Sequence, residues 1–177
     1  MRAAALAALA LAGCQAERLP ERQSAPGSAF IAAQINDMFE KTCGISNPSL
    51  ETIDAAVRRL GASHASEAGG IAFYSLRQVT DGVGTNVTLE NDDGVLRCSV
   101  SSSDSGEPIE VVEHLAATIK NNGGIAAAPL KVGSGYSDCQ SFRVGAALRS
   151  ACTYDFTPHG ISADLILTVP ANNAAVS

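Results

Sequence analysis

The sequence predicts an α+β domain in which about three helices pack on one face of a mostly antiparallel sheet held by two disulfides. Three observations predict this class. Apolar residues recur at helical spacing in three segments, and each segment ends near a glycine. Segments of alternating apolar and polar residues, separated by turn residues, indicate strands and hairpins. Four cysteines remain once the first is set aside, an even number that suits two disulfides.

The composition narrows the classes of function. A chain of 177 residues makes a single domain the expectation. Its formal net charge is −6 and it has no basic run, which argues against nucleic acid as a partner. The same acidic balance argues against a surface that is attracted to anionic lipid head groups.

The first fourteen residues carry the most specific motif. Residues 3–12 contain only alanine and leucine, a run of the length found in signal peptides and too short to span a bilayer. Leu11-Ala12-Gly13-Cys14 closes this run, and the sequence then becomes polar. These four residues resemble the lipobox of bacterial lipoproteins at all four positions. The alternative interpretation is an ordinary secretory signal.

The resemblance implies a fate for Cys14. In that family the signal, here residues 1–13, is removed, the thiol receives a diacylglyceryl group, and the new amino group is acylated, with palmitate the expected group. Two or more chains bind a membrane firmly, so membrane lipid becomes a partner through Cys14. Gln15 stands where an aspartate would retain an enterobacterial lipoprotein in the inner membrane. The expected location is therefore the cell envelope, anchored in the outer membrane and facing the periplasm.

The rest of the chain divides into three parts. Residues 14–28 hold the lipidated cysteine and a flexible tether with Pro20 and Pro26. We expect a single globular domain over residues 29–171 and a frayed tail over 172–177.

Three helices are predicted. The first runs from about Ser28 to Cys43. The second is capped by Asn47-Pro48 and ends at Gly61. The third begins at Pro108, ends at Asn121-Asn122-Gly123-Gly124, and has Ile109 on its apolar side. Between the second and third helices, residues 62–70 are interpreted as a loop.

The strands are predicted from alternation and turns. The expected segments are Ile71–Val79, a hairpin of Gly84–Glu90 and Val95–Ser101, an edge strand Ile125–Val132, then Cys139–Val144, Leu148–Phe156 and Ile161–Val169. In the last strand Leu165 and its alternate neighbours face one side, and Asp164 and its neighbours face the other. A capped helix followed by a hairpin with an inward cysteine occurs twice, which suggests a duplication.

Four cysteines allow three disulfide connectivities. Cys139 and Cys152 bracket a predicted hairpin and are therefore paired, which leaves Cys43 with Cys98. The chain has no CxxC motif, so a zinc knuckle or a thioredoxin-type redox site is not supported.

No motif for catalysis or for a cofactor is recognised, and no catalytic residue, metal ligand or cofactor is assigned. His64 and His159 fall in predicted loops or turns, and His114 lies four residues after Glu110 on the third helix. The sequence has neither an HExxH motif nor a GxSxG motif.

Three functions stay open. The first is a non-enzymatic periplasmic lipoprotein with an envelope interaction or structural role, and an envelope protein as partner. The second is a small binding module, such as an inhibitor of an exported hydrolase, that presents a strand edge or loop near Tyr136. The third is an unrecognised enzyme, which needs a cleft with converging titratable groups.

Overall fold

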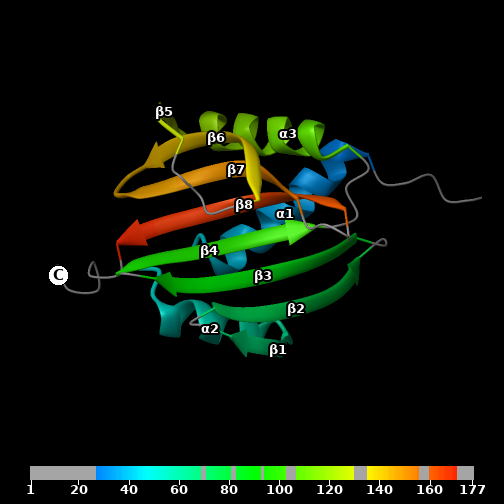
Figure 1. The fold of residues 1–177 in the computed structure, drawn as a ribbon, viewed down its shortest axis with the longest axis vertical. Coiled ribbons are helices and arrows are strands. Elements are labelled where there is room, and N and C mark those ends of the chain that lie inside the picture. The colour runs from blue at the N-terminus through cyan, green and yellow to red at the C-terminus, as the bar shows by residue number, and fades with distance from the viewer. Residues whose placement is uncertain are drawn as a thin grey trace, which may run out of the picture.

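The computed structural model describes residues 27–68, 71–80, 83–92, 94–102, 107–129, 135–155 and 160–170. Within them the chain forms three helices and one eight-stranded sheet with the order β1-β2-β3-β4-β8-β7-β6-β5, in which every pairing is antiparallel. The elements are α1 (Ser28–Thr42), α2 (Leu50–Arg59), β1 (Ser63–Ala68), β2 (Ile71–Thr80), β3 (Val83–Asp92), β4 (Val95–Ser102), α3 (Pro108–Asn121), β5 (Ile125–Ala127), β6 (Tyr136–Val144), β7 (Ala147–Asp155) and β8 (Ile161–Pro170) (Figure 1). The predicted α+β class with an antiparallel sheet is confirmed.

The strand order divides the sheet into two halves. β1 to β4 form one meander, β5 to β8 form another, and the two meet where β4 pairs with β8 (Figure 1). α1 and α2 precede the first meander and α3 precedes the second. The two halves therefore share one architecture, as the suspected duplication requires. The cysteines do not follow it, because Cys98 lies on β4 and Cys152 lies on β7, which are not equivalent strands.

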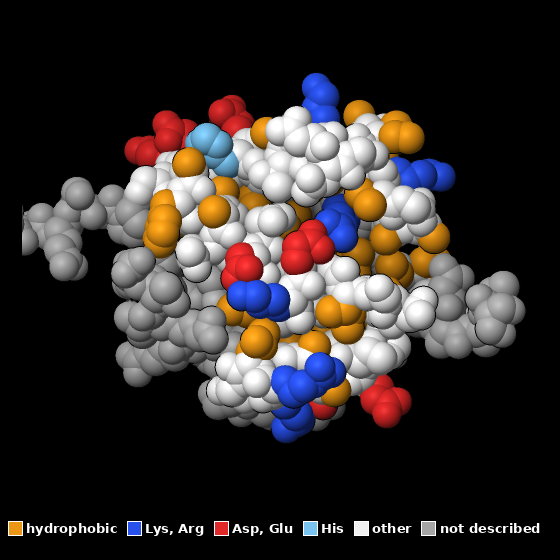
Figure 2. Space-filling model, turned by 180° about the vertical axis from the view of Figure 1, so that it is seen from behind, with side chains coloured by type: hydrophobic (Ala, Val, Ile, Leu, Met, Phe, Trp, Pro, Cys, Tyr) orange, Lys and Arg blue, Asp and Glu red, His pale blue; other side chains and the backbone are white. Residues whose placement is uncertain are grey.

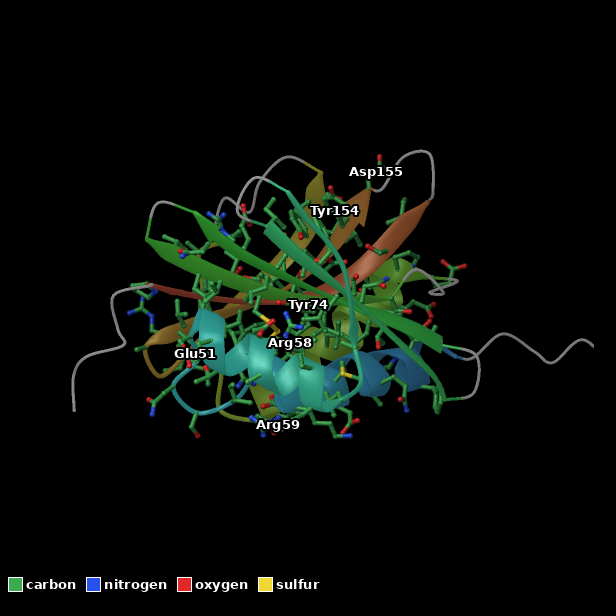
Figure 3. The ribbon with its side chains drawn as sticks, turned by 90° about the horizontal axis from the view of Figure 1, so that it is seen from below. Glu51, Arg58, Arg59, Tyr74, Tyr154 and Asp155 are labelled. Carbon is green, nitrogen blue, oxygen red and sulfur yellow. A yellow bond between two sulfur atoms is a disulfide. The ribbon has the colours of Figure 1, made fainter. Side chains whose placement is uncertain are left out.

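The core lies between the helices and one face of the sheet. α1 passes behind the sheet in Figure 1, and Figure 3 shows the helices below the sheet. One buried cluster joins helix residues to alternate strand residues, among them Ile35, Phe39, Leu115, Leu96, Val100, Leu165 and Leu167. We call the face with these strand residues the helix side, and the opposite face the outer face. Figure 2 views the helix side, where charged side chains of both signs are interspersed with scattered hydrophobic ones.

The start of α2 differs from the prediction by two residues. Ser49, and not Asn47, caps the helix: its hydroxyl accepts from the backbone N–H of Thr52, and the Thr52 hydroxyl accepts from the Ser49 N–H at 2.9 Å. This reciprocal pair satisfies two N–H groups that a helix start leaves without partners. Asn47 has a φ of +55° and precedes the helix. Gly61 ends it with a φ of +79°, as predicted.

Two strand predictions are corrected. Residues 62–70 were expected to form a loop, but Ser63–Ala68 is β1 and pairs with β2 at the edge of the sheet. Backbone hydrogen bonds to β2 hold this edge strand, and its small, polar sequence lacks the apolar alternation that marks a strand. β6 starts at Tyr136, earlier than expected, because an irregular register between Ser137 and Gln140 interrupts its alternation. β5 lies at the other edge, as predicted, but ends at Ala127.

Candidate functional site

Two disulfides fix the domain. Cys43, at the end of α1, is bonded to Cys98 of β4 with the Cα atoms 5.6 Å apart. Cys139 of β6 is bonded to Cys152 of β7, with a Cα separation of 4.1 Å. Both predicted disulfides are therefore present, with the pairing that was predicted from the hairpin between Cys139 and Cys152. Cys14, residues 1–26 and the tail from residue 171 lie outside the described residues.

The most unusual polar group of the described chain is the carboxyl of Asp164 on the outer face of β8. Only 4% of this residue is exposed. The hydroxyl of Ser162 donates to its carboxylate at 2.8 Å, and the phenol of Tyr136 donates from 3.4 Å. Strand alternation predicted Asp164 on the face opposite Leu165, but it did not indicate that this side of β8 is buried.

Burial controls the protonation of this cluster. It raises the pKa of Asp164 to about 6, although the hydrogen bonds from Ser162 and Tyr136 act in the opposite direction. Burial also raises the pKa of Tyr136, as do the charge of Asp164 and the nearby Tyr154, whereas a hydrogen bond with Ser99 lowers it. The phenol of Tyr136 therefore stays protonated, and the cluster takes up or releases one proton on Asp164 at mildly acidic pH.

The two meander strands β6 and β7 position the tyrosines. Tyr136 and Tyr154 are register partners, and their ring centroids are 4.6 Å apart. Gly135 precedes them with a φ of +102°, and a Cβ atom there would come within 2.7 Å of the Tyr154 ring. Only glycine combines this backbone conformation with so close an approach. Cys152 is the register partner of Asp164, so the second disulfide joins the strands beside the cluster.

A second tyrosine and aspartate meet on the helix side. Tyr74 of β2 donates its phenol hydrogen to Asp54 of α2, and the Nε of Arg58 donates to both Asp54 oxygens, at 2.8 and 3.0 Å. Figure 3 shows Arg58 beside Tyr74. Burial, followed by the contact with Asp54, raises the pKa of Tyr74 to about 12. The Arg58–Asp54 ion pair lies within α2, and the bond from Tyr74 to Asp54 joins that helix to the sheet.

A half-buried arginine holds α1 to the second meander. The guanidinium of Arg149 on β7 contacts Glu40 of α1 at 2.6 Å and lies over the ring of Phe39, 5.1 Å from its centroid. Because α1 is also bonded to β4 through Cys43, it connects the two halves of the sheet.

The histidines form no site in the described part of the chain. His114 is exposed on α3, and its neighbour Glu110 accepts a hydrogen bond from Ser28 at 2.8 Å. His64 lies in β1, where side chains are not described, and His159 lies outside the described residues. No three His, Cys, Asp or Glu side chains among the described residues are grouped so that they could hold a metal ion.

Comparisons of the chain with protein-family models, with characterised proteins and with solved structures find no match. None of the described helices is long and apolar enough to cross a membrane.

Proposed function

We propose that the protein is an exported, lipid-anchored domain of the cell envelope with a non-enzymatic interaction or structural role. The observation that carries the proposal is the use of the cysteines: two disulfides engage four of the five. Disulfides form and persist in oxidising compartments such as the periplasm. The fifth cysteine, Cys14, is the one at the lipobox, where a free thiol is needed for lipid.

The chemistry of the polar clusters supports a role without catalysis. A general acid or base must come within hydrogen-bond reach of a substrate proton. Asp164 has the most suitable pKa, about 6, but it is 4% exposed and its carboxylate already accepts bonds from Ser162 and Tyr136. Glu40 and Arg149 join α1 to the sheet, and Asp54, which pairs with Arg58 within α2, joins α2 to the sheet through Tyr74. Asp54 and Glu40 hold the fold together and Asp164 is enclosed within it, so we place the functional part of the domain on its surface.

The proposed architecture suits a partner protein in the envelope. With the helices on one face of the sheet and the middle of the outer face buried at Asp164 and Ile166, the two sheet edges are left for a partner. The two disulfides and the Arg149–Glu40 contact make the domain rigid, which lowers the entropy cost of binding.

Lipidation is tested first. Mass spectrometry of the mature N-terminus should show an acylated Cys14, and an unmodified cysteine there would refute the anchor.

Pull-downs from intact envelopes then compare the wild type with Cys14→Ala, and Gln15→Ala serves as a control that keeps the lipid. Partners that are lost only with Cys14→Ala support a membrane-localised interaction. The absence of any partner in all three forms would contradict the interaction role. Gln15→Asp should move the protein to the inner membrane if outer-membrane sorting follows the enterobacterial rule.

A binding module that inhibits an exported hydrolase is the second candidate, and the exposed edge at β5 favours it. Ile125 is 72% exposed there, and in the described chain β5 pairs with β6 alone. A strand edge offers backbone groups to a partner strand. The phenol of Tyr136 does not project as an anchor, because it bonds to Asp164. Assays against exported hydrolases should find inhibition that Ile125→Ser weakens and Leu50→Ser, at another exposed site, leaves intact; inhibition of no hydrolase would remove this candidate.

A further inference from the structure

Two exposed isoleucines lie at the end of the domain where the described chain begins. Ile109, in the first turn of α3, is 58% exposed, and Ile161, the first residue of β8, is 53% exposed. The hydroxyl of Ser28, the first residue of α1, bonds to Glu110 in the same turn of α3. Figure 1 shows α1, α3 and β8 starting at one end. The sequence predicted Ile109 on the buried stripe of α3, but this first-turn residue is exposed.

The distance to the proposed anchor is short. Residues 15–27 separate Cys14 from the first residue of α1. A flexible chain of that length spans on average about 20 Å, less than the diameter of a small domain. The anchor therefore keeps this end of the domain closer to the lipid surface than the opposite end, where α3 leads into β5 (Figure 1).

We infer that the end of the domain formed by the first turns of α1 and α3 and the start of β8 rests on the lipid surface, with Ile109 and Ile161 in contact with it. The inference rests on the proposed anchor at Cys14. A tether confers a high local concentration, so two isoleucine side chains suffice for a contact that would be negligible for an untethered domain.

The charges at this end define the kind of lipid. Glu107 precedes α3 and Glu110 lies in its first turn, and both are exposed. Carboxylates are repelled by anionic head groups within a Debye length. The contact therefore depends on apolar burial in a zwitterionic surface, and anionic lipid weakens it.

The absence of tryptophan from the chain permits a direct test. Single substitutions Ile109→Trp and Ile161→Trp introduce the only indole at an exposed position, where it displaces no core residue. Ile125→Trp is the matched control, because Ile125 is more exposed still, at 72%, and lies beyond the far end of the 14-residue α3, about 21 Å along its axis. The lipidated full-length variants are placed in vesicles of dibrominated phosphatidylcholine, and indole emission is compared with that in unbrominated vesicles.

Emission from residues 109 and 161 should be quenched and shifted to shorter wavelength, and emission from residue 125 should not change. Admixture of phosphatidylglycerol should reduce the quenching. Proteins that float with the vesicles but show no quenching at 109 and 161, or equal quenching at all three positions, would overturn this inference and leave the anchor intact. A wild type that carries no lipid and does not float would overturn the anchor and the inference together.

Discussion

The two halves of the sheet share an architecture but stabilise it by different means. Each half has a disulfide and a tyrosine that donates to an aspartate. In the first half, Tyr74 bonds to Asp54 across the helix–sheet boundary, and Arg58 supplies a positive charge. In the second half, Tyr136 bonds to Asp164 within the sheet, where the uncharged hydroxyls of Tyr136 and Ser162 donate to the carboxylate.

This difference shows how one pair of residue types can have opposite electrostatic consequences. A cation beside a carboxylate favours its ionised form, whereas burial among neutral groups favours the protonated form. In the first pair, the Asp54 carboxylate is ion-paired with Arg58 within α2 and accepts the Tyr74 phenol hydrogen from the sheet. The second is a buried acid whose pKa of about 6 makes the second half sensitive to pH.

Removal of the disulfides should have the largest effect on stability, and the effect should differ between the two halves. Cys43→Ala with Cys98→Ala removes a bond that spans 55 residues, and Cys139→Ala with Cys152→Ala removes one that spans 13. Loss of the restriction on the unfolded chain is expected to lower the free energy of unfolding by about 4 kcal/mol for the first pair and about 3 kcal/mol for the second. Urea denaturation of the unlipidated proteins measures both. A larger loss at the shorter loop would show that local packing of β6 and β7 outweighs the entropy of the loop.

Asp164→Asn should stabilise the protein above pH 6. The pKa of Asp164 is about 6 in the folded state and 3.8 as the ordinary value, so the folded state holds the proton more tightly. Stability from this group is complete below pH 3.8, declines as pH rises towards 6, and is lost above it. The shift corresponds to about 3 kcal/mol. Urea denaturation should therefore give equal stability for the wild type and Asp164→Asn below pH 4, and a more stable variant at pH 7.5. Equal stability of the wild type and Asp164→Asn at both pH values would refute the raised pKa of Asp164.

The predicted and the missed features differ in how local their signals are. β8 was predictable because Ala163, Leu165 and Leu167 fall on every second position, and the Cys139–Cys152 disulfide because its cysteines bracket a hairpin. The cluster around Asp164 was not predictable. Alternation assigns Asp164 to the outer face but does not indicate burial, which depends on Tyr136, 28 residues away, and on an irregular register in β6. Long-range packing of this kind leaves no periodic signal in the sequence.

Tyr74→Phe tests the first pair and should have a smaller effect. The substitution removes the phenol hydrogen bond to Asp54 but leaves Arg58 in place, so the free energy of unfolding should fall by about 1 kcal/mol. Asp54→Asn removes the charge as well, and high salt should reduce its effect because Arg58 is exposed. The effect of Asp164→Asn, by contrast, should change little with salt. Urea denaturation at low and high salt makes this comparison. If the effect of Asp54→Asn did not depend on salt, the Tyr74–Asp54 and Tyr136–Asp164 pairs would not differ in their electrostatics.

Tyr136→Phe should have the smallest effect on stability, but it should shift the pKa of Asp164 in a defined direction. Its phenol lies 3.4 Å from the Asp164 carboxylate, a long bond, and it favours the ionised carboxylate. Removing it should raise the pKa of Asp164 further above 6, which moves the loss of stability to higher pH. NMR titration of the Asp164 carboxyl carbon measures the shift, and Tyr74→Phe is the matched control that should leave this titration unchanged. A fall in the pKa with Tyr136→Phe would show that the phenol contributes to the burial of Asp164 more than to its hydrogen bonding, because an opened cluster readmits water to the carboxylate.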